Sequence, residues 1–494
     1  MFAKSGYNIK IRGDQDLHGR TQLKIRPDSR EATYLRTKLS SDIHHRLGLP
    51  TISANFVNLY INDKYMGFYI LEDAIKKSWI KYEYNDEKTT TLYECKSTGS
   101  DLTVAKNSRK CVNENDEVTD NSDLIELLTA LDNANSAEDI EDIFDVDLFL
   151  YEIAYEYLTG SWDHFLHYGH NYYLYKTKSG IWKYIVTDYD GDFGQDISVG
   201  ITGMVTDHFP SDKADFVHYS FNDWFHIPRR IIDVLIINDP TRFNNILKKF
   251  VKDAFNPAAL FPHIDELKKF IRPYVILDKT PDENGKYPGK HHEGVDHYSL
   301  EEFEANCEFT TIKSMHRSRA YGLKYWILEK YRYVCKNYDM DCDPQYMDEN
   351  YEYIIDESVY CSLEEDGWVL WDNEEPEPTE TIDEEPESTE TTDEEPEPES
   401  TETTDEEPEP EPTEVDDEPP KPTPPGPSKP PKSIEPKPPK PPKTNDPKST
   451  KSNEPKSPKS VDQPKKSPLK KADWIIKIYI KNIEKKLEKK LEKN

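Results

Sequence analysis

The amino-acid composition changes abruptly after Asn373, and this change limits what the chain can fold into. Between Glu374 and Glu418 there are 24 acidic residues and no Lys or Arg, arranged in repeats of Glu, Pro and Thr. From Lys421 onward there are 21 lysines, many of them beside prolines. Such segments have too few apolar residues to form a core. We therefore expect one large globular unit before Asn373, followed by a disordered tail.

The tail divides further by composition. The acidic Pro/Glu/Thr repeat (374–420) and the Lys/Pro-rich linker (421–470) are expected to be disordered. Residues 471–494 regain apolar residues at intervals, which predicts a short basic amphipathic helix. Residues 336–373 are expected to form a Cys-containing extension of the globular unit.

Charge and hydropathy argue against nucleic acid as a partner and against a membrane-spanning helix. The whole chain has a net charge of −33, and the globular unit before Glu374 carries −22 of it, so this unit is acidic. Nucleic-acid binding needs a basic face, and none is expected here. No stretch is long and apolar enough for a transmembrane helix. The first residues do not have the pattern of a signal peptide.

The first 80 residues predict a small lobe rich in β-strands. Apolar residues alternate over 7–11 and 22–26, which predicts two strands. Residues 33–47 repeat Leu or Ile every four positions, which predicts a helix that ends at Gly48. Residues 56–71 predict a hairpin that turns at Asn62, Asp63 and Lys64.

The next 250 residues are predicted to be mainly helical. Residues 123–159 are amphipathic, and residues 171–176 and 182–187 predict two strands. Helices are expected over 222–335, interrupted at Pro228, Pro240, Pro257 and Pro273. There are six cysteines. Cys95 and Cys111 flank a polar loop and form a plausible local disulfide, while the other pairings stay open.

Three polar residues around the two predicted strands indicate a phosphoryl-transfer site. Such a reaction needs a carboxylate near the acceptor hydroxyl, and an Asn and an Asp that hold Mg²⁺ against the phosphates. Asp163 and Asn171 precede the strands, and Asp188 follows directly after the second. Asp190 is a candidate second metal ligand.

The residues alone leave two alternatives open. Asp192-Phe193-Gly194 has the letters of the kinase DFG motif, so Asp192 competes with Asp188 for the metal-binding role. Asp188, Asp190 and Asp192 also have the alternate spacing of a structural calcium loop.

Four stretches carry a resemblance to a known family. They are residues 3–11, 35–50 (ending in Leu-Gly-Leu-Pro), 56–72, and 171–194 with its Asp-x-Asp-x-x-Phe-Gly. In their order and spacing over about residues 3–335, the chain resembles the CotH kinase family. These are atypical protein kinases similar to spore coat protein H, here of the type found in anaerobic gut fungi.

The resemblance implies an α+β, bilobal, protein-kinase-like fold over 1–335. A β-rich N-lobe (about 1–80) and a mainly helical C-lobe (about 120–335) would hold ATP and Mg²⁺ or Mn²⁺ between them. Asp163 would be the catalytic residue. Asp188, Asn171 and Asp190 would be the metal ligands.

The resemblance also implies nucleotide-binding positions. One of Lys4, Lys10 and Lys24 would approach the phosphates, and Lys10 is favoured because it lies on an alternating strand. Glu72 and Asp73 end a strand whose backbone would hold adenine. The family's phosphate-covering loop and its first strand precede the position where this chain starts, so we expect an N-terminally incomplete N-lobe.

The expected function is phosphorylation of Ser or Thr in secreted or surface proteins, and the chain's own Ser/Thr-rich tail is a possible substrate. The alternative is a non-catalytic surface or adhesion protein with a kinase-like fold. The resemblance to this family implies an extracellular or cell-surface location.

Overall fold

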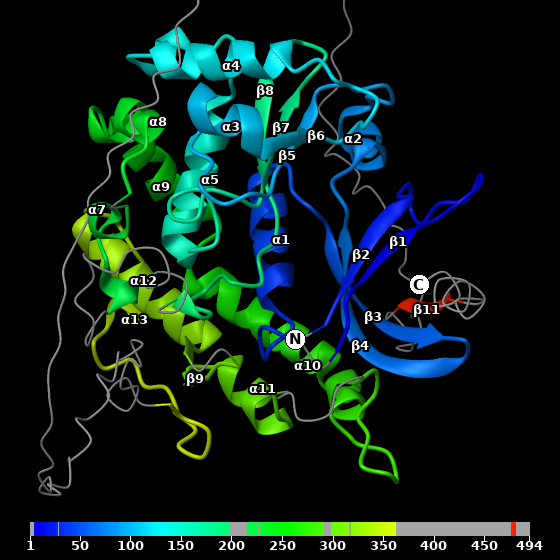
Figure 1. Cartoon of the computed structure of the whole chain (residues 1–494). Coiled ribbons are helices and arrows are strands. Elements are labelled where there is room, and N and C mark those ends of the chain that lie inside the picture. Colours follow the sequence, from blue (N-terminus) through cyan, green and yellow to red (C-terminus); the bar gives the residue numbers. More distant parts are fainter. Residues whose placement is uncertain are drawn as a thin grey trace, which may run out of the picture. The chain divides into compact units, whose positions relative to one another are not determined.

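A computed structural model describes residues 4–27, 29–197, 215–225, 227–290, 298–315, 318–361 and 476–480. The chain separates into two units, Met1–Asp372 with Lys471–Asn494, and Asn373–Lys470. All the labelled elements in Figure 1 belong to the first unit. The second unit lies outside the described residues, so the disorder expected for the acidic and Lys/Pro-rich segments stays a prediction.

The first sheet contains both strand pairs expected near the N-terminus. Its order is β1-β2-β4-β3-β11, and β1 to β4 pair antiparallel. Asn62 and Asp63 form the turn between β3 and β4, both with positive φ, a conformation that Asn and Asp adopt more readily than most residues. The strands are β1 (Tyr7–Lys10), β2 (Gln22–Arg26), β3 (Ala54–Ile61), β4 (Lys64–Asp73) and β11 (Ile476–Ile480).

The two faces of this sheet have different chemistry. Leu23, Ile25, Val57 and other apolar residues form a small cluster on one face. Because side chains alternate along a strand, Lys24 and Arg26 of β2 lie on the other face. Helix α1 (Arg36–Leu47) ends at Gly48, whose φ is 71°, and the helix packs between β3 and α9 (Thr241–Asp253; Figure 1).

A second sheet has the order β6-β5-β7-β8, with every pair antiparallel. Strands β7 (Tyr172–Lys176) and β8 (Trp182–Val186) agree with the sequence prediction. Strands β5 (Leu92–Cys95) and β6 (Cys111–Asn113) were not predicted. Cys95 and Cys111 lie opposite each other and form the expected disulfide. Cys335 and Cys342 form a second disulfide.

Helix α5 packs against β8 of the second sheet and is buried along most of its length. The presence of both helices and sheets confirms the part of the fold prediction that called for mixed α and β content. The helices are α2 (Lys77–Tyr84), α3 (Val104–Lys110), α4 (Ser122–Asn133), α5 (Val146–Thr159), α7 (Phe221–Trp224), α8 (Arg230–Ile232), α9 (Thr241–Asp253), α10 (Pro257–Asp278), α11 (Leu300–Asn306), α12 (Leu323–Asn337) and α13 (Pro344–Met347).

Two local predictions differ from the structure. Helix α10 continues through Pro273, although a proline inside a helix costs about 3 kcal/mol. Its buried residues, such as Leu260, Ile264 and Ile271, pack in the main core along the helix and offset this cost.

The other difference lies in the predicted C-terminal helix, 471–494. Residues 476–480 form a strand that pairs parallel with β3. Their order Ile-Lys-Ile-Tyr-Ile alternates with a period of two and is rich in β-branched residues, which favours a strand beside an open sheet edge. The rest of this segment lies outside the described residues.

No helix in the described part of the chain has the length and apolar character needed to cross a lipid bilayer.

Candidate active site

The loop between α5 and β7 brings Asp163 and Asn171 together. Nδ2 of Asn171 donates to the main-chain oxygen of Asp163 at 2.9 Å and to its Oδ2 at 3.2 Å. Nε2 of His170 donates to Oδ1 of the same carboxylate. The side chain of Asp163 remains 20% exposed. It is therefore held in one orientation and is still accessible from solvent.

The loop after β8 presents Asp188 and Asp190. Asp188 has a φ of 73°, so the chain turns sharply as the strand ends. Its Oδ2 accepts from Nη2 of Arg26 at 2.8 Å. Asp190 lies 3.7 Å from Arg26 and 3.7 Å from Arg30. Both carboxylates have 27% of their side-chain surface exposed.

These charges act strongly on one another. Burial alone would raise the pKa of Asp188, but the charges of Arg26 and Lys24 lower it to about 2. Burial, together with the charge of Asp188, raises the pKa of Asp190 to about 6. Burial raises the pKa of Glu72 to about 7, and the charge of Arg26 opposes this shift. Of these three carboxylates, Asp188 therefore stays ionised down to the lowest pH.

The pKa of His170 is raised by its contact with Asp163. Although burial disfavours its charged form, the hydrogen bond to Asp163 and the charge of that residue raise the pKa of His170. The ion pair with Asp163 therefore favours the charged form of the His170 imidazole.

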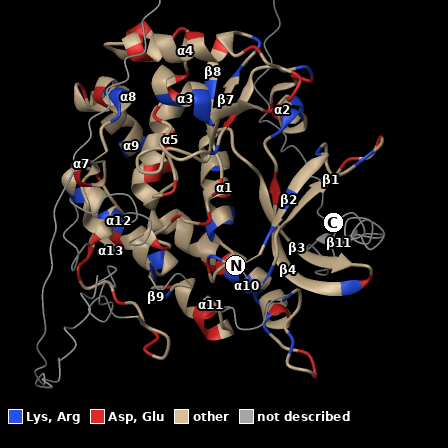
Figure 2. Ribbon diagram, viewed as in Figure 1, with Lys and Arg blue, Asp and Glu red and all other residues tan. Residues whose placement is uncertain are grey.

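Of the three candidate lysines, Lys24 is the one whose charge acts on the acidic cluster. It lies opposite Glu72 in the sheet, and its charge lowers the pKa of both Glu72 and Asp188. Figure 2 shows the basic residues of β2 beside the acidic end of β4. Lys10 is exposed on the outer strand β1.

Lys4 forms a buried ion pair with Asp278 instead of contacting the acidic cluster. Its buried Nζ donates to Oδ1 of Asp278 at 2.7 Å and to the main-chain oxygen of Phe68 at 2.8 Å. The structure therefore favours Lys24, and not Lys10 or Lys4, as the lysine beside the carboxylates.

Glu72 and Asp73 take different positions at the end of β4. The buried side chain of Glu72 lies 3.6 Å from Arg26 and belongs to the cluster. Asp73 accepts from Nε of Arg20 at 2.6 Å, and its N–H donates to the main-chain oxygen of Ser53 at 3.1 Å. The adenine-binding role expected of this backbone stays a prediction.

Asp192 points into the protein interior. It is fully buried, and its carboxylate accepts from the hydroxyls of Ser161 and Tyr155. Asp188, Asp190 and Asp192 therefore do not converge on one point as a calcium loop requires. Among the residues described, no three His, Cys, Asp or Glu side chains are arranged to hold a metal.

A magnesium ion bound together with a nucleotide fits the donors that are present. Mg²⁺ usually takes one or two protein carboxylates and completes its shell with phosphate oxygens and water. Asp188 and Asp190 provide two accessible carboxylates. Arg26, Arg30 and Lys24 provide the positive charge that phosphates need nearby.

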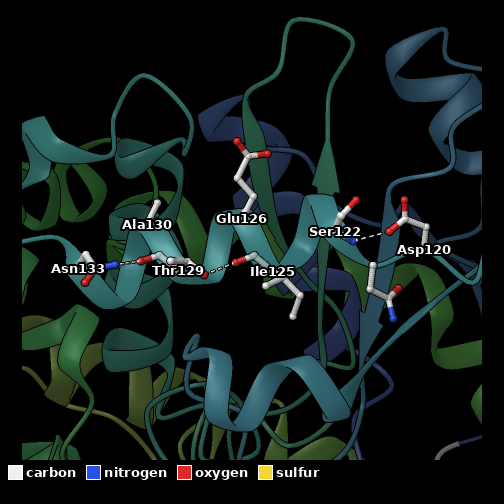
Figure 3. Close-up of a pocket in the computed structure, with 8 residues that line it drawn as sticks. Asp120, Ser122, Ile125, Glu126, Thr129, Ala130 and Asn133 are labelled. Atoms are coloured by element: carbon white, nitrogen blue, oxygen red, sulfur yellow. Dashed lines mark hydrogen bonds between the residues drawn. The ribbon is translucent and has the colours of Figure 1, made fainter. Parts of the chain in front are cut away.

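A groove elsewhere in the first unit lacks the combination of carboxylates with Arg and Lys that the candidate site has. Figure 3 shows the groove along α4, with Ile125, Glu126 and Thr129 among the residues that line it. None of the candidate site residues lines this groove.

Sequence reasoning missed Arg26, Arg30 and His170. Arg26 follows Lys24 by two positions on β2, so strand alternation places both on one face. This alternation could have identified Arg26 from the sequence. His170 and Arg30 lie in loops, where no periodicity indicates which way a side chain points.

Comparison with known proteins agrees with the family resemblance found in the sequence. The family model described as "CotH kinase protein" matches residues 1–313. Spore coat protein homolog 1 of Rhizopus delemar is 26% identical over 301 residues, which cover 56% of this chain and 46% of that protein. Invasin CotH3 of the same organism is 27% identical over 311 residues, with 56% and 48% covered. Inner spore coat protein H of Bacillus subtilis is 23% identical over 291 residues, with 56% and 75% covered. The chain thus spans about half the length of these two fungal relatives.

Proposed function

Because the chain belongs to the CotH kinase protein family, we propose that it is an atypical protein kinase that transfers phosphate from ATP to Ser or Thr hydroxyls. The observation that carries this proposal is the meeting of two loops, where the N–H of Thr187 donates to the main-chain oxygen of Asn171 at 3.0 Å and His164 bonds the main-chain oxygen of Thr187 at 2.9 Å. One holds Asp163 with Asn171, and the other presents Asp188 and Asp190 to the cations of β2. The first sheet would act as the N-lobe and the helical part as the C-lobe of a kinase-like fold.

In this proposal Asp163 is the general base. The acceptor oxygen attacks the terminal phosphorus of ATP, the bond to the ADP oxygen breaks, and the hydroxyl proton passes to Asp163. His170 and Asn171 fix the orientation of that carboxylate through their hydrogen bonds. A hydrogen-bonded carboxylate in one position avoids the entropy cost of orienting it during the reaction.

Asp188 and Asp190 would hold Mg²⁺ or Mn²⁺, which supplies charge neutralisation at the phosphates when bound. Arg26 and Arg30 would contact the phosphate oxygens, since planar guanidinium groups suit bidentate phosphate binding. Lys24 would add a third positive charge. The low pKa of Asp188 supports its role as the ionised ligand.

The substrates are proposed to be secreted or surface proteins, because the relatives are named as spore coat proteins and invasins. The Ser and Thr residues of the chain's own tail are candidate acceptors in the same molecule. We propose an extracellular or surface location on the same basis.

A non-catalytic surface function is the second candidate. The names of the Rhizopus delemar invasins favour it. The ion pair between Arg26 and Asp188 favours it as well, because it occupies a carboxylate that a kinase needs for its metal.

Incorporation of labelled phosphate from ATP separates the two functions. Wild type, Asp163→Ala, Asp188→Ala and the exposed control Asp147→Ala are compared with Mg²⁺ and with Mn²⁺. We expect wild type and Asp147→Ala to label a protein substrate or themselves, and Asp163→Ala and Asp188→Ala to lose at least about a hundredfold. Equal labelling by all four chains, or none by any of them with either metal, would reject the kinase proposal.

A further inference from the structure

Asp192 connects the two loops of the candidate site through a buried hydrogen bond. Its Oδ1 accepts from Oγ of Ser161 at 2.5 Å, and its Oδ2 accepts from the hydroxyl of Tyr155. Ser161 lies two residues before Asp163, and Asp192 lies four residues after Asp188. A single buried carboxylate is thus bonded to the loop of the general base while belonging to the loop of the metal ligand.

The main chain around Asp192 is also fixed. Its carbonyl oxygen accepts from Nε of Arg36 at 2.9 Å, and Arg36 is fully buried in α1. The N–H of the next residue, Phe193, donates to the main-chain oxygen of Thr159 at 2.6 Å. The segment is therefore attached both to α1 and to the end of α5.

The two loops also contain residues in an unfavourable backbone conformation. Asp188, Phe193 and Asn171 have φ values of 73°, 54° and 61°. Residues other than glycine persist in this region only when their surroundings determine the conformation. Gly194 is as confined, because a Cβ added there would lie 2.5 Å from the ring of Trp326.

We propose that Asp192 is a positioning residue that fixes the loop carrying Asp163 to the loop carrying Asp188 through its bond to Ser161. Asp192 itself is enclosed and contacts no reacting group. Its catalytic importance rests on the proposed kinase function, whereas the mechanical link does not.

Hydrogen exchange of the full chain tests the link without any assay of activity. The variants are Asp192→Ala, Asp192→Asn and Ser161→Ala. The control is Asp278→Asn, which alters a buried carboxylate that bonds Lys4, Tyr34 and Phe68. In Asp192→Ala and Ser161→Ala, we expect exchange in both 161–171 and 188–197 to rise at least about tenfold, with a smaller rise in Asp192→Asn. In the control these two segments stay close to wild type.

An increase in only one of the two segments would overturn the proposal, and so would the same increase in the control. Ser161→Ala keeps the test open if Asp192→Ala does not fold, because it removes the same bond from the other side.

Kinetics provide a second test if the wild type transfers phosphate. We expect Asp192→Ala to lower kcat with little change in the KM for ATP, and Asp192→Asn to retain more activity. The double variant Asp192→Ala/Ser161→Ala should be no slower than Asp192→Ala, because both changes break the same link. Additive losses, or an unchanged kcat for the folded protein, would contradict the proposal. A wild type without activity would reject the kinase function, and the exchange result would still decide the link.

Discussion

Arg26 donates from Nη2 to Oδ2 of Asp188 over 2.8 Å, and this ion pair joins two residues that are 162 positions apart. It connects β2 of the first sheet to the loop that follows β8 of the second. The pair is partly exposed, with 30% of the Arg26 side chain and 27% of the Asp188 side chain accessible. A ligand that enters here meets both charges at once.

Replacing Arg26 should weaken nucleotide binding. In Arg26→Gln one positive charge beside Asp188 is lost, and we expect the KM for ATP to rise about tenfold, since a charge-assisted hydrogen bond contributes about 1.5–3 kcal/mol. Arg26→Lys should recover part of the loss, because an ammonium keeps the charge but not the fork geometry. Steady-state kinetics with varied ATP measures this, and an unchanged KM in both variants would exclude Arg26 from phosphate binding.

Lys24 and Lys10 form a matched pair on neighbouring strands. We expect Lys24→Met to raise the KM for ATP about fivefold to tenfold, because its charge acts on Asp188 and Glu72 and an added phosphate contact has this magnitude. Lys10→Met should stay within about twofold of wild type, since exposed charges contribute little. The same kinetic assay decides between them, and the reverse order would restore Lys10 as the phosphate ligand.

Glu156 should make stability depend on pH. Burial raises the pKa of Glu156 to about 8, although the N–H groups of Leu166 and Phe165 donate to its carboxylate. Because the folded pKa lies above the unfolded one, this stabilising contribution is complete below about pH 4.5 and is lost as the pH rises through 8. The free energy of unfolding should therefore fall between pH 5 and 8, by at most about 1.4 kcal/mol per pH unit from this group.

Glu156→Gln tests this effect, because an amide does not titrate. Urea unfolding at pH 5, 6, 7 and 8 should show a smaller decline in the variant. The variant should also lose about 1 kcal/mol at pH 5, since the amide oxygen accepts from only one of the two N–H groups. Parallel curves for the two proteins would show that Glu156 is not the group responsible.

Strand β11 should protect the edge of β3. Ile478 lies opposite Leu59 in the parallel pairing, and a proline there removes the N–H that a ladder requires. In Ile478→Pro we expect faster hydrogen exchange for those amides of Ala54–Ile61 that face β11, while those that face β4 stay protected. Ile478→Val is the matched control because it keeps the N–H. Identical protection in both variants would mean that the edge of β3 is not covered by this strand.

Several local elements could be predicted from neighbouring residues. The alternation over 7–11 and 22–26 gave strands, and Gly48 ended α1 because its left-handed conformation suits that residue. Asn62 and Asp63 made the tight turn of the β3–β4 hairpin. The short separation of Cys95 and Cys111 was enough to suggest their disulfide.

Other features could not be predicted because they depend on distant partners. Strand β5 pairs with β7, from which it is separated by α3, α4 and α5. Pro273 is tolerated because the apolar face of α10 is buried in the main core. The apolar spacing over 471–494 as a whole predicts a helix, whereas the order of 476–480 alternates as in a strand, and pairing with the edge of β3 selects the strand.

The sequence alone therefore determined the local elements, the division of composition at Asn373, the family resemblance, and the chemical types present around residues 163–192. Each of these depends on short-range periodicity, turn preferences or residue order. Only the tertiary structure decided that Asp188 faces Arg26 and that Asp192 faces inward to Ser161. It also placed Lys24 beside the carboxylates and Lys4 beside Asp278. The physical reason is that the direction of a loop side chain is set by the groups that pack against it, and here those groups come from strands and helices far away in the chain.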